Sequence, residues 1–199
     1  MKVQARATLW APFGTAAPLA AFKASGVTLH ERADIGCVLM TSAVNSADIV
    51  AAASVAAGVD LPLEAGETKI GQGRTAVWLT PRSWLVQCRI EEEPSLVTSV
   101  NDAFPDKRLH AVRFTDSLCW FELSGAEALD CLTEGGFVSL EPRGLPVGHA
   151  KRTLIAAVAA IVIHAAENLW VVGVERSRAR YFADWLIGNS QVPPFRRLS

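Results

Sequence analysis

The stretch Ala76-Val-Trp-Leu-Thr-Pro-Arg-Ser-Trp-Leu-Val86 decides the fold class of this 199-residue chain. Valine, tryptophan and leucine on both sides of the stretch are typical of β-strands, whereas Thr80 and Pro81 favour a turn or a short helical start between them. The pattern therefore predicts one strand at 75–79 and a second at 84–90, and we expect the two to form a hairpin-like pair.

A helix is expected directly after this strand pair. Pro94 follows three glutamates, which suit the positive end of a helix dipole. Leu96, Val100 and Phe104 then repeat at a spacing of four, which places them on one face of a helix. We expect this face to pack on the sheet.

A second helix is expected upstream, in the alanine-rich segment 47–57. Ser46 is a suitable N-cap and Gly58 can take the left-handed conformation that ends a helix. Before this helix, strands at 27–31 and 37–40 are expected to flank a turn at 34–36.

The order strand, strand, helix occurs twice more downstream. The expected elements are strands at 111–114 and 118–123 around a turn at 115–117, a helix after the capping box Ser124-Gly-Ala-Glu127, strands at 153–163 and 169–175, and a helix capped by Ser177 with a core stripe at Ala179, Phe182, Ala183, Leu186 and Ile187. Strand pairs followed by a covering helix predict an α+β protein with an antiparallel or mixed sheet and helices on one face. Residues 60–73, which are rich in glycine and proline, are expected to form a loop.

Length and composition bound the class of protein. One domain spanning 1–199 with one core is the simplest organisation, with an N-terminal arm at 1–25 and a C-terminal tail at 189–199. Because 19 basic and 20 acidic side chains nearly cancel, no net field would attract nucleic acid or an anionic membrane. Half of the residues are hydrophobic, which indicates either a well-filled core or apolar surface covered by another chain.

Targeting signals and cysteine spacing point to an ordinary cytoplasmic chain. The longest apolar run, 154–163, is about half of the roughly 20 residues that span a bilayer, so we expect a buried strand there. Pro12 and Gly14 interrupt the apolar N-terminal stretch and argue against a secretory signal peptide. The cysteines lack zinc-ligand or CxxC spacing, so we expect reduced, mostly buried thiols; they are Cys37, Cys88, Cys119 and Cys131.

Candidate catalytic and binding residues each have a simpler structural interpretation. Gly71-Gln-Gly73-Arg-Thr-Ala76 matches a dinucleotide-binding pattern, but a β-prone segment follows where a helix is required, so we expect a turn. No histidine has a carboxylate or cysteine at a spacing that implies a triad or a metal site; the four are His30, His110, His149 and His164. We therefore predict no catalytic residue and no metal site in this chain.

The acidic and aromatic residues also have simpler structural interpretations. The run 91–93 of three glutamates is expected to be a solvated acidic turn that favours a helix dipole. Core packing is expected for most of the tryptophans in regular elements, although an exposed one could stack on a folate or flavin or lie at an interface; they are Trp78, Trp84, Trp120, Trp170 and Trp185.

Several stretches, in order, resemble the gamma subunit family of heterotetrameric sarcosine oxidase, whose fold is related to the folate-binding glycine cleavage T-protein. The match covers about residues 18–188, and the most specific piece is Trp78-Leu-x-Pro81-x-x-Trp84-Leu85. The other pieces are Pro18–Phe22, Glu31–Met40, Gly58–Pro62, Phe121–Leu129, Gly148–Leu154 and Ser177–Leu186. The chain departs from the family at Thr80-Pro-Arg-Ser-Trp84 and at Met40-Thr-Ser42, which puts in doubt partner contacts made through the family's side chains there.

The resemblance implies a non-catalytic assembly subunit of a complex that oxidatively demethylates sarcosine to glycine. It implies alpha, beta and delta partner subunits that hold FAD, FMN, NAD and tetrahydrofolate, and no cofactor in this chain. The alternative is a stand-alone folate-dependent one-carbon protein, which would need a carboxylate to hold the pterin and an aromatic wall to cover it. Asp116 and Trp120 could supply these two groups.

Overall fold

The computed structural model describes residues 22–24, 26–44, 46–136 and 144–190 and divides into two compact units. Among the described residues, the first unit contains those up to 33, those within 118–147 and those from 151 onward, and the second contains those within 34–117 and 148–150. Each unit has its own cluster of buried hydrophobic side chains. The expectation of one core is therefore wrong, because the strands divide between two sheets that each need a covering layer.

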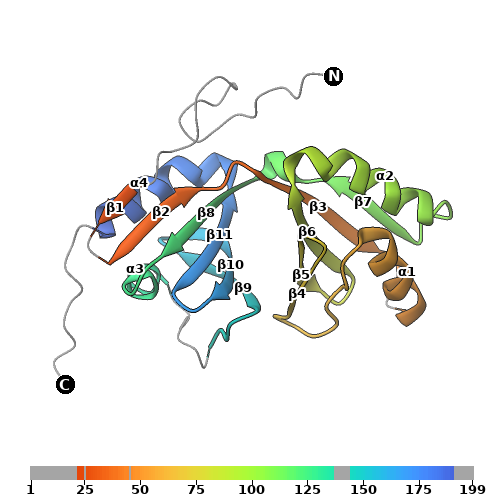
Figure 1. Ribbon diagram of the computed structural model, residues 1–199, viewed down its shortest axis with the longest axis horizontal. Helices are drawn as coiled ribbons and strands as arrows, with labels where there is room; N and C mark the ends of the chain where they lie inside the picture. The colour runs from red at the N-terminus through yellow and green to blue at the C-terminus, as the bar shows by residue number, and fades with distance from the viewer. Residues whose placement is uncertain (1–21, 25, 45, 137–143, 191–199) are drawn as a thin grey trace. The chain divides into compact units, whose positions relative to one another are not determined.

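The second unit is built on a five-stranded sheet in the order β4-β5-β6-β3-β7 (Figure 1). Its strands are β4 (Thr68–Gly71), β5 (Arg74–Thr80), β6 (Ser83–Arg89), β3 (Ile35–Ser42) and β7 (Leu109–Arg113). The four pairings in this order are antiparallel. The expected hairpin is confirmed as β5 and β6, in which Trp78 lies opposite Trp84.

Two helices cover one face of this sheet, α1 (Ala47–Ala57) and α2 (Glu93–Ala103). Val38 and Met40 alternate along β3 toward the helices, as Trp84 and Val86 do along β6. The Trp84 indole N–H donates a hydrogen bond to the Pro62 carbonyl oxygen at 2.8 Å, so its polar edge is satisfied in the core. The two helices and the sheet thus form the layered core that the spacing of apolar residues predicted.

The edge strand β7 is closed by a side chain from α2. The Asn101 side-chain Nδ2 donates to the Ala111 backbone carbonyl oxygen at 2.9 Å, and the Ala111 N–H donates to the Asn101 side-chain Oδ1 at 2.9 Å. Asn101 thus pairs with β7 as a neighbouring strand residue would. An edge strand whose backbone groups are satisfied in this way cannot accept a further strand at that point.

The first unit is built on a six-stranded sheet in the order β1-β2-β8-β11-β10-β9. Its strands are β1 (Phe22–Ala24), β2 (Val27–Glu31), β8 (Leu118–Ser124), β11 (Leu169–Glu175), β10 (Val158–Ala166) and β9 (His149–Ile155). Trp120 on β8 lies opposite Gly173 on β11, and a Cβ atom on Gly173 would lie 2.6 Å from the Trp120 ring. The missing side chain of Gly173 makes room for the indole.

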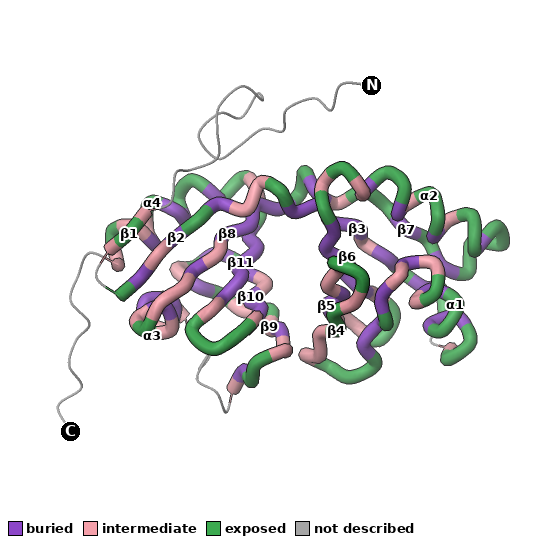
Figure 2. The backbone as a smooth tube through the Cα atoms, viewed as in Figure 1, coloured by how far each residue is buried: buried purple, intermediate pink, exposed green. Residues whose placement is uncertain are grey.

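The helices α3 (Ala128–Thr133) and α4 (Ala179–Ser190) pack on this sheet. The predicted stripe of α4 is confirmed, since Ala179, Phe182, Ala183 and Leu186 are buried. The Phe182 ring packs on Phe121 of β8 with 5.9 Å between the ring centroids. Figure 2 shows buried and exposed segments alternating along α4, whereas β8 is buried over most of its length.

The strands expected at 27–31 and 37–40 are confirmed as β2 and β3 on either side of a turn, although β2 pairs with β1 and β8 and β3 pairs with β6 and β7. The strand pair expected at 111–114 and 118–123 is wrong, because β7 and β8 lie in different sheets. A single 3₁₀ turn at Thr115–Ser117, η2, separates them, and the sequence signal for a short turn does not show whether the chain folds back on itself.

Local details also differ from the expectations. The expected loop 60–73 contains the strand β4, and the expected strand 153–163 is split by Ala156 and Ala157, whose φ angles are 50° and 62°. These positive angles form a tight turn between β9 and β10, although alanine seldom adopts them.

The expected helix caps are only partly confirmed. Gly58 ends α1 with a φ of 63°, but the Ser46 hydroxyl bonds to the Asp48 carboxylate instead of a backbone N–H. Ser124 ends β8, so the capping box is wrong, and Ser177 lies within the 3₁₀ turn η3 (Arg176–Arg178) instead of capping α4. The remaining short turn, η1, spans Ile90–Glu92.

The arm expected at 1–25 and the tail expected at 189–199 lie largely outside the described residues, although Asn189 and Ser190 belong to α4. Within the part of the chain that the structure describes, every helix is too short or too polar to cross a bilayer.

Gly125 is the glycine whose replacement we expect to be most damaging. Its φ is 120°, and a Cβ atom would overlap the carbonyl oxygen of Gly26. Gly125→Ala should therefore lower the free energy of unfolding by about 3 kcal/mol or more. Gly73→Ala is the control, because Gly73 also has a positive φ of 74° but no atom lies within 4 Å of its Cβ position. Gly73→Ala should lower the free energy of unfolding by about 1–2 kcal/mol. Equal urea midpoints for the two variants would contradict the predicted backbone clash.

Candidate functional site

The histidines occupy separate places in the fold. His30 and His110 are exposed on β2 and β7, and His149 is half-buried at the start of β9. His164 is buried on β10, stacks on Trp170 with 3.8 Å between ring centroids, and has Nδ1 2.8 Å from the Leu145 carbonyl oxygen. It is a satisfied core residue. Across residues 22–24, 26–44, 46–136 and 144–190, no three His, Cys, Asp or Glu side chains are grouped so that they could hold a metal ion.

The three glutamates expected to form a solvated turn have different environments. Glu91 is exposed and lies 3.6 Å from an Arg89 nitrogen. Glu92 pairs with Arg89 at 2.7 Å, and hydrogen bonding to Arg89 holds the pKa of the Glu92 carboxyl below its ordinary value. Glu93, however, is 0% exposed. The expectation is wrong for Glu93, because the first residue of α2 points into the unit while its two neighbours point out.

Glu93 forms a buried network that joins three elements. Its carboxylate accepts hydrogen bonds from the Thr115 N–H at 3.2 Å, from the Thr115 hydroxyl, and from Arg113 Nε at 3.0 Å. The Cys37 N–H in turn donates to the Thr115 hydroxyl oxygen at 2.7 Å. The start of α2, the turn η2 and the strand β3 are thereby held by one carboxylate, which is an arrangement that fixes structure.

Asp116 and Trp120, the pair weighed for a folate site, do not offer the expected pocket. Trp120 is 1% exposed and its ring is packed over Gly173, so no ring face is open to a pterin. Asp116 lies exposed in η2. Trp84 and Trp170 are also almost fully buried, which confirms core packing for these tryptophans, while Trp78 and Trp185 are half-buried.

The pattern Gly71–Ala76 is a hairpin turn, as expected. Gln72 and Gly73 have φ angles of 50° and 74° and connect β4 to β5. Two positive φ angles in a two-residue connection are typical of a type I′ turn, which matches the twist of the strands. No helix follows the glycines, so this segment lacks the helix N-terminus that would bind a pyrophosphate.

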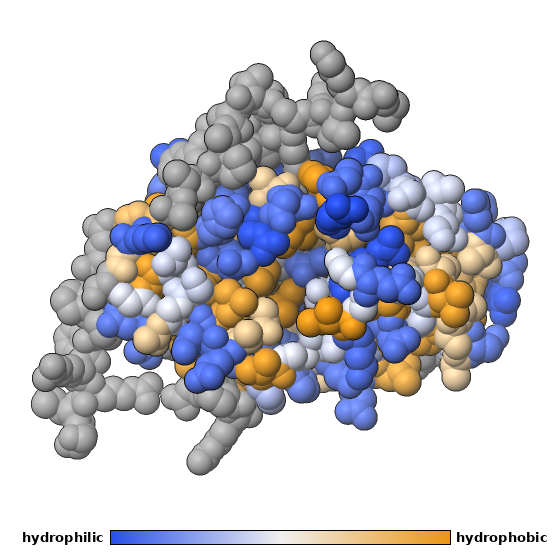
Figure 3. Space-filling view, viewed as in Figure 1, coloured by the Kyte–Doolittle hydropathy of each residue, from blue (hydrophilic) through white to orange (hydrophobic). Residues whose placement is uncertain are grey.

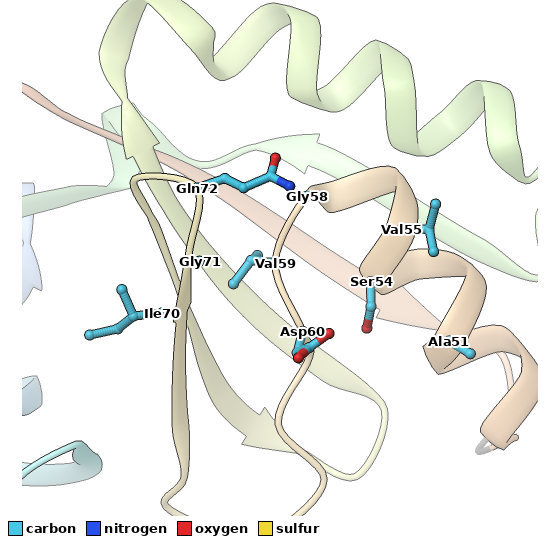
Figure 4. A pocket seen from close by; sticks show the side chains of 9 residues that line it. All are labelled: Ala51, Ser54, Val55, Gly58, Val59, Asp60, Ile70, Gly71 and Gln72. Atoms are coloured by element: carbon cyan, nitrogen blue, oxygen red, sulfur yellow. The ribbon is translucent and has the colours of Figure 1, made fainter.

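A groove of about 580 Å³ lies between α1 and the β4–β5 hairpin (Figure 4). Its polar groups are the Asp60 carboxylate, the Gln72 amide and the Ser54 hydroxyl. Ser54 is already engaged, because its hydroxyl donates to the Val50 carbonyl oxygen and accepts from the Leu61 N–H. Figure 4 shows Asp60 extending from the loop toward α1, while Ile70 points away from the helix. The groove brings no acid–base pair together.

All four cysteines are free and buried, which confirms the expectation of reduced core thiols. Burial raises the pKa of the Cys88 and Cys131 thiols to about 11. A thiol in this state is protonated at neutral pH and therefore a poor nucleophile.

The sequence profile of the "Sarcosine oxidase, gamma subunit family" matches residues 43–191. Among curated protein sequences, no match is found.

Two solved structures are similar to the chain. One is from "Heterotetrameric Sarcosine Oxidase from Corynebacterium sp. U-96 in complex with pyrrole 2-carboxylate", with a TM-score of 0.77 and 25% identity over 85% of this chain and 87% of that chain. The other is the glycine cleavage system aminomethyltransferase T from Bartonella henselae, with a TM-score of 0.63 and 9% identity over 84% of this chain and 47% of that chain. The second similarity shows the fold alone, and it confirms the predicted α+β, T-protein-like architecture.

Removal of the Glu93 carboxylate should destabilise the second unit. Glu93→Ala leaves the buried Thr115 N–H without its acceptor, so we expect the free energy of unfolding to fall by about 2–3 kcal/mol. Glu91→Ala is the matched control, because the Glu91 side chain is 50% exposed and its ion pair with Arg89 should contribute less than about 1 kcal/mol. Urea unfolding of both variants measures the difference, and equal losses would contradict the structural role of Glu93.

The buried thiols predict a loss of stability at alkaline pH. The pKa of Cys88 and Cys131 is raised from 9.0 to about 11 in the folded chain, so between these values the native state keeps protons that the unfolded state has lost. The contribution of the two protonated thiols to the free energy of unfolding is complete below pH 9 and is lost as the pH rises toward 11. Urea midpoints should therefore fall across this window. The fall should be shallower in a Cys88→Ala, Cys131→Ala double variant, and an unchanged slope would contradict the assignment.

Proposed function

This chain belongs to the sarcosine oxidase gamma subunit family, and we propose that it is a non-catalytic assembly subunit of a heterotetrameric sarcosine oxidase. The observation that carries the proposal is the structural similarity to a chain of such an enzyme, which extends over 87% of that chain. A match of this extent supports the same position in a complex.

The environments of the reactive side chains support a structural role. Glu93 is held by Thr115 and Arg113, His164 is stacked on Trp170, and the thiols are buried. These side chains form hydrogen bonds or stack with other side chains of this chain, or they are buried in the two cores. We infer that the chemistry takes place on the partner subunits, which oxidise sarcosine to glycine and release formaldehyde, or methylenetetrahydrofolate, together with hydrogen peroxide.

The partners that we propose are the alpha, beta and delta subunits of the same enzyme, in the cytoplasm. In this proposal they bind FAD, FMN, NAD and tetrahydrofolate, and the gamma chain contacts protein alone. The alternative, a stand-alone folate-dependent one-carbon protein, is less well supported because Trp120 has no open ring face. A titration of the isolated chain with tetrahydrofolate separates the two hypotheses, since saturable binding would favour the alternative.

The proposal predicts that the complex depends on this chain for assembly. The alpha, beta and delta subunits of the same organism are expressed with and without it, and the products are compared by mass, flavin absorption and sarcosine-dependent peroxide formation. With the chain, we expect a stoichiometric flavin-containing complex. Without it, we expect dissociated subunits.

A complex that reaches full mass and full activity without the chain would overturn the assembly role. Glu91→Ala serves as the folded control, because Glu91 is an exposed residue outside both cores and this variant should assemble as the wild type does.

A further inference from the structure

The outer face of α1 is apolar, which is unusual for a surface helix. The helix buries Ile49, Val50, Ala53 and Ala57 against the sheet. Its solvent-exposed positions are also mostly apolar; they are Ala47, Asp48, Ala51, Ala52 and Val55. A helix that is hydrophobic around most of its circumference is usually covered on both sides.

The other long helices of the chain have ordinary polar outer faces. The exposed residues of α2 include Ser95, Thr98, Ser99 and Asp102, and those of α4 include Arg180 and Asp184. Figure 3 shows the contrast on the second unit, where the surface over α1 is pale to full orange and the surface over α2 is mostly blue and white. The apolar face is therefore specific to α1.

Helix propensity explains the alanines of this face but not its valine. Alanine is the strongest helix former, so exposed alanines stabilise a helix without any partner. Val55 is β-branched, forms helices less readily, and is 84% exposed. A side chain of this kind contributes little on a solvated face, whereas it contributes fully when another surface covers it.

The groove next to α1 places one carboxylate beside this apolar face. Asp60 lies in the groove with Ala51 and Val55, and it has no ion-pair partner among the described residues. The pKa of Lys69 is raised above its ordinary value mainly by its hydrogen bond with Glu67 at 2.7 Å, and to a smaller extent by the charge of Asp60. Asp60 is exposed and forms no ion pair with a described residue, so its carboxylate can pair with a cation supplied from outside.

We propose that the outer face of α1 and the adjoining groove dock another subunit of the complex, through an apolar segment that carries a lysine or arginine directed at Asp60. This inference rests on the proposed function and names the surface that performs it. Ala51 and Ala52 allow close approach, Val55 is the apolar contact, and Asp60 sets the position of the segment.

The charge of the groove favours a different subunit over a second copy of this chain. In a symmetric dimer the same surface meets itself, so this face would bring two Asp60 side chains into one interface. Like charges in a desolvated interface are unfavourable. A partner with a basic side chain matches the surface, whereas an identical copy does not.

The test compares three variants of the docking face with one control. Val55→Lys, Ala52→Lys and Asp60→Lys place a cation on or beside α1, and Thr98→Lys places the same cation on the exposed face of α2. Each full-length chain is immobilised, and a mixture of the separately purified alpha, beta and delta subunits is the probe. We expect at least about tenfold weaker binding for the first three variants, since a lysine would be desolvated without a partner, and less than about twofold change for Thr98→Lys. Thermal unfolding should be unchanged in all four, because the positions are exposed.

The outcomes separate this inference from the proposed function. If the wild type binds and all four variants bind equally well, the docking face is wrong and the assembly role stands. If the wild type binds none of the subunits in the mixture, both fail. If the wild type self-associates and Val55→Lys makes it monomeric, the face joins two copies of this chain and the assignment to a different subunit is overturned.

Discussion

The carboxylate of Glu93 is the interaction on which the second unit depends. A carboxylate without solvent contact must be satisfied by hydrogen bonds, and here Thr115 and Arg113 supply them. Because Thr115 also accepts from Cys37, the same bonds set where α2 begins, where β7 ends and how β3 lies between its neighbours. A change in any one of these elements would break bonds in the other two. The network thus makes the helix layer and the sheet one cooperative body.

Local patterns predicted the elements of this fold much better than their pairing. The hairpin of β5 and β6, the helix 47–57 and the buried stripe of α4 follow from turn chemistry, composition and spacing, which are properties of neighbouring residues. The assignment of β7 and β8 to different sheets does not, because it depends on contacts between residues far apart, such as Thr115 with Cys37. The turn at Ala156 and Ala157 was missed because alanine carries no signal for a positive φ.

The proposed docking face was predictable only in part. The segment 47–57 contains a single charged residue, Asp48, and this near absence of charge was visible in the sequence as alanine content. Exposure was not visible, so the same pattern could describe a fully buried helix. Glu93 shows the opposite case, in which a charged run suggested a solvated turn although one member is fully buried. The direction in which one side chain of a run points depends on where the helix begins, and a boundary error of one residue is enough to reverse it.

The pairing of Asn101 with Ala111 affects how the chain behaves when no partner subunit is bound to it. A subunit with an exposed apolar helix face can aggregate before its partners bind, and unpaired strand edges are the usual route to irreversible aggregates. By filling the backbone positions of β7 with its own side chain, α2 removes one such template. The molecule can therefore expose the apolar outer face of α1 without also offering, at this edge, a place where β-aggregates would grow.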